Sequence, residues 1–396
     1  MKIGINLWLL VEEGGGVCNY VLTLLRHWNQ YFPGDALVIF SFPQNETLLS
    51  TLPSSCRKDE IRLRAQEEIN DYLDRFDIYF CPIGSLYPRP LPKPSVITLV
   101  DIQERFYPEF FKQEDLESRL HHYDISLKIA DRIITISEFS KKTFVRILGI
   151  SKRKIDCIYL CADEMPEALQ PKGWPLPKNK KFIIYPANNW LHKNHKSLII
   201  ALKILDKRGK YIPCVFTGSL LNGMNDWEQV VKLKGNINNL HHLGRLSRAE
   251  LSWLYRHASI LVYPSLFDGF GIPIVEAMES GLPIACANRT SLPEVAADAA
   301  LFFDPKDPES IAANIERLWE DESLQKRLIQ KGYDQCHRFT PQNLVKAHRL
   351  TFKKACRTYK PWLHFYRLWL HQRNDRKTRN TLNRREKRVA ASLLKL

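Results

Sequence analysis

The chain has 396 residues, 44% hydrophobic and 26% charged, a composition that excludes intrinsic disorder and a length that suits two α/β domains. Its net charge of +15 is concentrated at one end, because residues 357–396 contain twelve Lys/Arg and two acidic residues and so carry +10 of it. No recognised nucleic-acid-binding motif accompanies this charge, so no nucleic-acid partner is expected.

The first half of the chain alternates strand-like and helix-like segments. They occupy residues 2–9, 14–28, 36–43, 78–82, 94–101, 127–150 and 154–161. Strands that alternate with helices form a parallel sheet covered on both faces, which predicts a doubly wound α/β domain. Glu12 and Glu13 interrupt the first apolar run, so we interpret the N-terminus as a strand rather than a signal peptide.

A proline-rich stretch at 165–181 breaks this alternation and predicts an interdomain linker. The second half then restarts it in residues 181–187, 195–205, 213–219, 239–246, 250–266 and 299–305. We predict an α/β fold of two Rossmann-like, doubly wound domains that face an interdomain cleft. Ligands are expected in that cleft because doubly wound sheets bind them at the carboxyl ends of their strands.

The cysteines and the apolar runs bear on the cellular compartment. Nine cysteines are scattered without a CxxC pair, so the sequence predicts neither a zinc site nor a disulfide framework. A reducing cytoplasm is the expected compartment. No run of about 18 apolar residues is present, so no membrane span is expected.

A glycine run, Gly14 to Gly16, follows the first strand and opens a helix. Backbone N–H groups at such a turn can approach an anion closely, and the helix dipole favours negative charge there. The run does not have the GxGxxG spacing, so a dinucleotide site is disfavoured. A plain strand-to-helix turn is the alternative interpretation.

The stretch "YPANNWLHKNHKSL" (185–198) ends a strand and starts a helix. Lys193 lies where its ammonium would reach a phosphate held in the crevice. His192 and His195 are interpreted as polar loop residues, because no acid or cysteine stands at a metal-ligand spacing from them. No two aspartates stand at i and i+2, so a diphosphate would be neutralised by cationic side chains and helix N-termini rather than by a metal.

The stretch "LFDGFGIPIVEAMESGLP" (266–283) reads as a glycine-bearing loop that becomes a helix at Pro273 and stops at Gly281. Asp268 is then expected on a loop after a strand, and Glu276 in the first turn of the helix. The alternative to a binding site is a pair of solvated acids, one of them favoured by the helix macrodipole.

Together these segments resemble glycosyltransferase family 4, whose members have the GT-B fold. Residues 266–283 match the E-x7-E signature of that family. Matches also occur at "ISEFSKKT" (136–143), "YPANNWLHKNH" (185–195) and "SLPEVAADAALFFDP" (291–305). The likeness covers roughly residues 3–355, and it looks most like the bacterial mannosyltransferases that assemble surface polysaccharides.

The resemblance implies a retaining, metal-independent hexosyltransferase that needs no cofactor beyond its nucleotide-sugar co-substrate. Mannose from GDP-mannose is the best-matched donor, and the acceptor is expected to be a glycan or a lipid-linked molecule. The alternatives are a nucleotide-sugar epimerase, a glycan phosphorylase, and a catalytically weak accessory subunit that binds a nucleotide sugar. Product analysis with and without an acceptor separates these, since an epimerase needs no acceptor.

The resemblance also implies roles for individual residues. Glu276 is expected to hold the ribose hydroxyls, and Asp268 the hydroxyls of the donor sugar. Lys193 is expected to bind the diphosphate, and Asp101 completes the catalytic set. The nucleotide-sugar site is expected to comprise Gly15, Gly16, Asn188, Lys193, Gly218, Arg245, Leu246, Asp268, Gly269, Phe270, Gly271 and Glu276.

Three positions depart from the family pattern. Asp268 is one methylene shorter than the usual glutamate. Asn188 stands where many members have an arginine that partners the lysine. Val100 stands where many members have a histidine before Asp101.

The resemblance divides the chain into an acceptor domain (1–170), a nucleotide-sugar domain (171–345), and a final helix that returns to the first domain with a basic tail (346–396). In that last segment the spacing of Trp362, Phe365, Tyr366 and Trp369 predicts one aromatic helical face. This face either packs against the N-terminal domain or docks, with the basic residues of the tail, on an anionic membrane. The expected location is the cytoplasm, with a peripheral contact at the inner face of the cell membrane in the second case.

Overall fold

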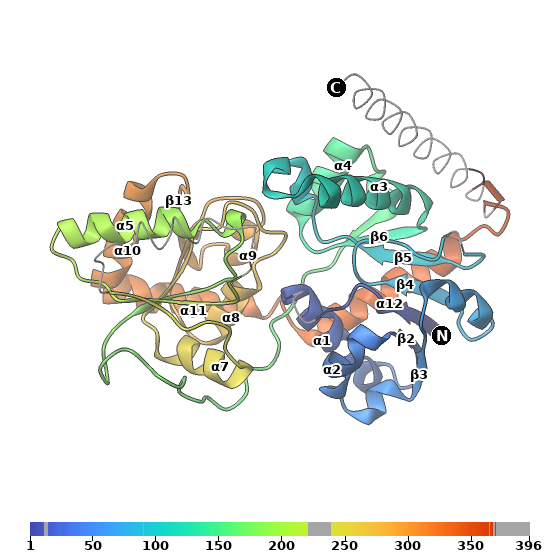
Figure 1. Ribbon diagram of the computed structural model, residues 1–396, viewed down its shortest axis with the longest axis horizontal. Coiled ribbons are helices and arrows are strands. Elements are labelled where there is room, and N and C mark those ends of the chain that lie inside the picture. The colour runs from blue at the N-terminus through green and yellow to red at the C-terminus, as the bar shows by residue number, and fades with distance from the viewer. Residues whose placement is uncertain (12–14, 90, 221–238, 364, 367–368, 370–396) are drawn as a thin grey trace, which may run out of the picture.

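The structure, a computed structural model, describes residues 1–11, 15–89, 91–220, 239–363, 365–366 and 369. Two lobes lie side by side, each built around a parallel sheet with helices on its faces (Figure 1). The chain builds the first lobe, on the right in Figure 1, then the second, and then returns to the first.

The sheet of the first lobe has the strand order β3-β2-β1-β4-β5-β6-β7, and every pair of neighbours is parallel. Its strands are β1 (Lys2–Asn6), β2 (Ala36–Ser41), β3 (Asp59–Arg62), β4 (Ile78–Cys81), β5 (Ser95–Thr98), β6 (Arg132–Thr135) and β7 (Ile155–Cys157). The α-helices that the first part of the chain contributes to this lobe are α1 (Gly16–Tyr31), α2 (Glu46–Ser50), α3 (Gln113–Ile129) and α4 (Glu138–Leu148). The register places Ile5 of the central strand opposite Ile39 and Phe80.

The sheet of the second lobe has the order β10-β9-β8-β11-β12-β13 and is also parallel throughout. Its strands are β8 (Ile183–Pro186), β9 (Cys214–Thr217), β10 (Leu240–His242), β11 (Ile260–Tyr263), β12 (Ile284–Ala287) and β13 (Ala300–Phe303). The helices that the structure describes around it are α5 (His195–Lys207), α7 (Arg248–His257), α8 (Ile272–Glu279), α9 (Leu292–Ala296), α10 (Pro308–Glu320) and α11 (Glu322–Cys336).

The strand sequences explain why both sheets are parallel and internal. Strands β4, β5, β9, β11 and β12 are buried along their whole length. Sheets covered by helices on both faces need such near-continuous apolar runs, whereas a half-exposed strand would alternate polar and apolar residues. Both strand orders reverse at the first strand of the lobe, which is the topological switch point of a doubly wound sheet. The predicted fold is confirmed.

Helix α12 (Pro341–Thr358) follows the second lobe in the sequence but packs against α1 and strands β4 to β6 of the first lobe (Figure 1). Phe352 stacks on Trp28 with ring centroids 5.6 Å apart. The Tyr20 hydroxyl lies 2.7 Å from Nε2 of the buried His348. The helix thus shares the core of the first lobe, and it begins ahead of the expected boundary at residue 346.

Beyond α12 the aromatic face is exposed. The exposed fractions are 64% for Trp362, 74% for Phe365, 53% for Tyr366 and 49% for Trp369. The alternative in which this face packs against the first domain is therefore wrong for these four side chains. The rest of the basic tail, 370–396, lies outside the described residues. Within the part of the chain that the structure describes, no helix is long and apolar enough to cross a membrane.

Candidate active site

A cavity of about 490 Å³ opens between the lobes at the carboxyl ends of both sheets. Loops after β1, β5 and β6 line it from the first lobe, and segments at the ends of β8 to β11 line it from the second. The structure brings every residue expected in the site to this cavity: Gly15, Gly16, Asp101, Asn188, Lys193, Gly218, Arg245, Leu246, Asp268, Gly269, Phe270, Gly271 and Glu276. The part that each plays in binding or catalysis stays a prediction.

Two glycines of the cavity wall lie against side chains of the opposite lobe. A Cβ atom on Gly16 of the first lobe would lie 2.9 Å from Cδ1 of Ile272 in the second. A Cβ atom on Gly269 of the second lobe would lie 2.6 Å from Oδ2 of Asp101 in the first. Both distances are shorter than real Cβ contacts, so a larger residue at either position would force the facing side chain, Ile272 or Asp101, to move.

Lys193 and Asp268 form an ion pair beside the carboxyl ends of β8 and β11. Nζ of Lys193 lies 2.6 Å from Oδ1 of Asp268 and donates to the Tyr263 hydroxyl at 3.0 Å. The two charged side chains are 14% and 13% exposed, so the pair is shielded from bulk water. Oδ2 of Asp268 is buried and has no hydrogen-bond partner among the described residues. The pair therefore offers an ammonium to an anion and an acceptor oxygen to a hydroxyl.

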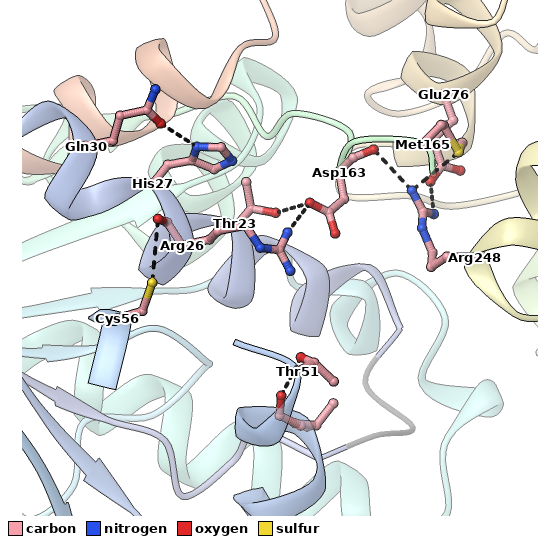
Figure 2. Close-up of polar contacts among 11 residues, drawn as sticks. Thr23, Arg26, His27, Gln30, Thr51, Cys56, Asp163, Met165, Arg248 and Glu276 are labelled. Atoms are coloured by element: carbon pink, nitrogen blue, oxygen red, sulfur yellow. Dashed lines mark hydrogen bonds and ion pairs between the residues drawn. The ribbon is translucent and has the colours of Figure 1, made fainter. Parts of the chain in front are cut away.

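Glu276 lies in the second turn of α8 rather than the first, because the helix already begins at Ile272. It is 4% exposed, so the alternative of a solvated acid is wrong for this residue. Oε1 accepts a hydrogen bond from Nη1 of Arg248 at 2.6 Å (Figure 2), and Oε2 accepts one from the Tyr255 hydroxyl at 2.7 Å. Burial raises the pKa of Tyr255 well above its ordinary value, so this hydroxyl is a donor at neutral pH.

Asp101 follows β5 and is the acidic group that the first lobe presents to the cavity wall. Its Oδ1 accepts a hydrogen bond from the backbone N–H of Gln103 at 3.0 Å. Burial raises the pKa of Asp101 to about 6, and the nearby negative charge of Asp268 acts in the same direction. Next to it, burial raises the pKa of Glu104 to about 7. Of these two carboxyls, Asp101 lines the cavity, so the cavity wall itself changes its charge near pH 6.

Hydrogen bonds connect the loops that contain Asn188, Gly218 and Arg245. Oδ1 of Asn188 accepts a hydrogen bond from the backbone N–H of Ser219 at 2.8 Å. The N–H of Gly218 donates to the carbonyl of Gly244 at 2.8 Å. Arg245 itself is exposed at the rim. Asn188 thus braces the loops after β8 and β9, and it brings no positive charge to the site.

The interpretation of His192 and His195 as polar loop residues is wrong for His195. This residue begins α5, is 6% exposed, and packs against the rings of Tyr185 and Phe216. Burial lowers the pKa of His195 to about 3, so the imidazole is neutral at pH 7. Among the described residues, no group of three or more His, Cys, Asp and Glu side chains is placed to hold a metal ion.

Two further contacts join the lobes close to residues 266–271, the loop that precedes α8. Phe267, which precedes Asp268, packs against Phe106 and Phe139 of the first lobe with ring centroids 5.2 and 5.9 Å apart. The Glu294 carboxylate of α9 accepts the backbone N–H groups of Glu138 and Phe139 at 2.6 and 2.9 Å. These are N–H groups at the start of α4, which have no partner inside their own helix. A residue of the second lobe thus caps a helix of the first.

Sequence reasoning missed several residues that shape the site, above all Arg248, Tyr255, Phe267 and Glu294. The sequence does contain one indication of the role of Arg248. It is the first residue of α7, and a cation is disfavoured at a helix N-terminus. A cation at such a position needs a carboxylate partner, which Glu276 supplies. The sequence contains no comparable indication for Phe267 and Glu294, because the residues they contact lie in the first half of the chain.

Comparison with known proteins agrees with this geometry. The family model described as "Glycosyl transferases group 1" matches residues 167–335. O-antigen chain mannosyltransferase B of Escherichia coli is 30% identical over 276 residues, which cover 65% of this chain and 70% of that protein. O-antigen chain mannosyltransferase RfbU of Salmonella typhimurium is 30% identical over 234 residues, 58% of this chain and 63% of that protein.

The fold is shared over nearly the whole chain with solved structures. A glycosyltransferase from Rickettsia africae superposes with a TM-score of 0.70 at 15% identity, over 90% of this chain and 99% of that one. The two doubly wound sheets facing a cleft are thus a GT-B arrangement. Given the family match and the E. coli relative, this chain belongs to the group 1 family of glycosyl transferases, and it is a glycosyltransferase.

Proposed function

We propose that this enzyme transfers a mannosyl residue from GDP-mannose to a glycan or lipid-linked acceptor, with retention of configuration and without a metal ion. The observation that carries the proposal is the interlobe cavity, which gathers Lys193, Asp268 and Glu276 on one wall. The two O-antigen mannosyltransferase relatives support mannose and a polysaccharide-type acceptor.

The donor is proposed to lie along the second-lobe wall. Glu276 receives the ribose hydroxyls, Lys193 faces the diphosphate, and Asp268 with the backbone of Gly269 to Gly271 faces the sugar. The N-terminal ends of α1 and α8 also border the cavity. Free backbone N–H groups and the helix dipole at such ends favour a bound anion.

The transfer is proposed to occur on one face of the sugar. The bond from the anomeric carbon to the β-phosphate oxygen breaks, and the acceptor oxygen bonds to that carbon from the same side. The acceptor's proton passes to the departing phosphate oxygen, so a histidine in place of Val100 is not required. Lys193 stabilises the charge that develops on the leaving group, where fixed electrostatic partners have their largest effect.

Metal independence is proposed on the basis of the sequence and of the lysine at the site. The sequence contains no pair of aspartates at i and i+2, which removes one common means of holding a divalent metal against a diphosphate. Lys193 is positioned to take that role, although its present partner is Asp268. A bound diphosphate would therefore compete with Asp268 for the ammonium.

A peripheral position at the cytoplasmic face of a membrane is part of the proposal. Its support is the exposed aromatic face at 362–369 together with the +10 charge of residues 357–396. Aromatic side chains suit the membrane interface, and each basic residue near an anionic surface adds about 1 kcal/mol of binding. A lipid-linked acceptor would be met at such a surface.

The test is a binding screen of nucleotide sugars against the full chain, followed by product analysis of the tightest binder with and without acceptors. We expect GDP-mannose to bind most tightly and GDP release to require an acceptor. A changed sugar formed without an acceptor would identify an epimerase instead. Tight binding without transfer to a panel of mannose-containing acceptors would favour an accessory subunit.

A further inference from the structure

Arg248 lies between the carboxylate of Glu276 and the segment that connects the lobes (Figure 2). Its Nη1 pairs with Oε1 of Glu276 at 2.6 Å, and its Nη2 donates to the backbone carbonyl of Asp163 at 3.1 Å. The same nitrogen contacts the sulfur of Met165 at 3.5 Å. Arg248 also lines the interlobe cavity, with its side chain 30% exposed. The guanidinium is thus fixed from two directions at the edge of the site.

The Glu276 carboxylate depends on this contact, because its side chain is 5% exposed. A buried carboxylate needs a counter-charge and hydrogen-bond donors to stay ionised. Arg248 supplies the charge on one oxygen, and Tyr255 donates to the other. An ionised carboxylate has about four acceptor positions, so each oxygen keeps one for a ligand hydroxyl.

The position of Arg248 in α7 supports a role other than helix stability. The start of α7 is already capped, because Ser247 and Glu250 exchange hydrogen bonds there. A cation in the first turn opposes the helix macrodipole. The arginine therefore gains its favourable interactions from Glu276 and from the interlobe segment, and not from its own helix.

We infer that Arg248 is a positioning residue for the donor, which holds the Glu276 carboxylate in the orientation that receives the two ribose hydroxyls of a nucleoside diphosphate. This inference rests on the proposed function, which takes ribose as the partner of Glu276. Arg248 acts through Glu276, and its second anchor at the Asp163 carbonyl fixes the guanidinium plane. Through Arg248, the ribose subsite is thereby connected by hydrogen bonds to the segment between the lobes.

The test uses the full chain, calorimetry, and four ligands: GDP, UDP and the 2′-deoxy form of each. We expect the wild-type protein to bind one ribonucleotide at least tenfold more tightly than its 2′-deoxy form. In Arg248→Met this preference should fall to about twofold or less, chiefly through weaker ribonucleotide binding, and Arg248→Lys should be intermediate. Arg256→Met is the matched control, because Arg256 is exposed on the same helix.

A double variant separates positioning from general damage to the fold. Arg248→Met leaves a buried carboxylate unpaired, whereas Arg248→Met with Glu276→Gln leaves no charge there. We expect the double variant to bind the ribonucleotide as Glu276→Gln alone does, and Arg248→Met to raise the donor KM with little change in kcat.

Equal losses for ribose and deoxyribose ligands in Arg248→Met, or additive losses in the double variant, would overturn the inference while leaving the proposed function intact. If the wild-type protein binds neither GDP nor UDP, the proposed function fails, and the inference fails with it.

Discussion

The two walls of the cavity come from similar parallel sheets, yet their polar groups are held in different ways. On the second-lobe wall, Lys193 is paired with Asp268, and Glu276 is held by two donors. The first-lobe wall presents the backbone of Gly15 and Gly16 and the carboxyl of Asp101, which changes its protonation near pH 6.

This difference fits walls that bind different ligands, one the donor and the other the acceptor. Charged side chains that the fold holds in place suit a ligand whose charges are the same in every turnover, and under the proposed function that ligand is a nucleoside diphosphate. A wall of backbone and a titratable carboxyl suits an acceptor that is bound by shape and hydroxyl groups. Under the proposed function, the acceptor would meet this first-lobe wall.

The largest effect on the transfer rate is expected from substituting Lys193 in the second-lobe wall. Lys193→Met removes the cation that we place on the leaving group, and loss of one such stabilising group lowers kcat by about 100- to 1,000-fold. Steady-state transfer assays in the presence of EDTA measure this directly. Lys196→Met is the control, because Lys196 is exposed on the same segment. A kcat within threefold of wild type for Lys193→Met would remove the lysine from the reaction.

A somewhat smaller effect is expected at Glu276, where binding rather than chemistry should suffer. Glu276→Ala should weaken nucleotide-donor binding by about 2–3 kcal/mol, the range of hydrogen bonds to a charged group. Glu276→Gln keeps the shape and one acceptor oxygen, so it should lose less. Calorimetry with the donor nucleotide reports both values. Unchanged affinity in Glu276→Ala would place the ribose elsewhere.

The first-lobe wall can be tested through the pH dependence of transfer. Burial raises the pKa of Asp101 to about 6, so the carboxyl is mostly neutral below that pH and ionised above it. If the ionised form accepts a hydrogen bond from an acceptor hydroxyl, transfer should rise between pH 5 and 7, by up to tenfold per pH unit below the pKa. This rise should be missing in Asp101→Asn. A rise that persists unchanged in the variant would assign it to another group, such as Glu104.

The smallest effect concerns the surface of the first lobe beyond α12. The protein is expected to bind liposomes that contain anionic lipid, and the binding should weaken with salt because exposed charges are screened. Deletion of residues 371–396 should abolish this binding while the midpoint of thermal unfolding stays unchanged. Sedimentation with liposomes at low and high salt is the measurement. If the full-length protein does not bind anionic liposomes at low salt, the tail has no role in membrane binding.

Much of this architecture was accessible from the sequence. Continuous apolar strands between helical segments predict doubly wound sheets, and the switch points of such sheets bring Gly16, Lys193 and Asp268 to one crevice. Even the turn at Gly271 and the end of α8 before Gly281 follow from local backbone chemistry.

The pairing of charges was not accessible from the sequence. Lys193 and Asp268 were each expected to face the ligand, and the structure pairs them with each other. Glu276 was expected in a first helical turn, and it lies one turn deeper and buried. Lys193 and Asp268 are 75 positions apart in the chain and meet because β8 and β11 are neighbours in one sheet, which local spacing does not show. The interlobe contacts of Phe267 and Glu294 likewise join residues far apart in the chain.

We propose above that the second-lobe wall holds a nucleotide sugar whose sugar is transferred without a metal ion and with its anomeric configuration retained. The most direct measurement is proton NMR of the anomeric signal while the full chain acts on GDP-mannose and a mannose-containing acceptor in excess EDTA. We expect one GDP to be released per glycosidic bond formed, with the anomeric configuration of the donor retained in the product. An inverted product, or transfer that stops in EDTA and returns with manganese or magnesium, would contradict it.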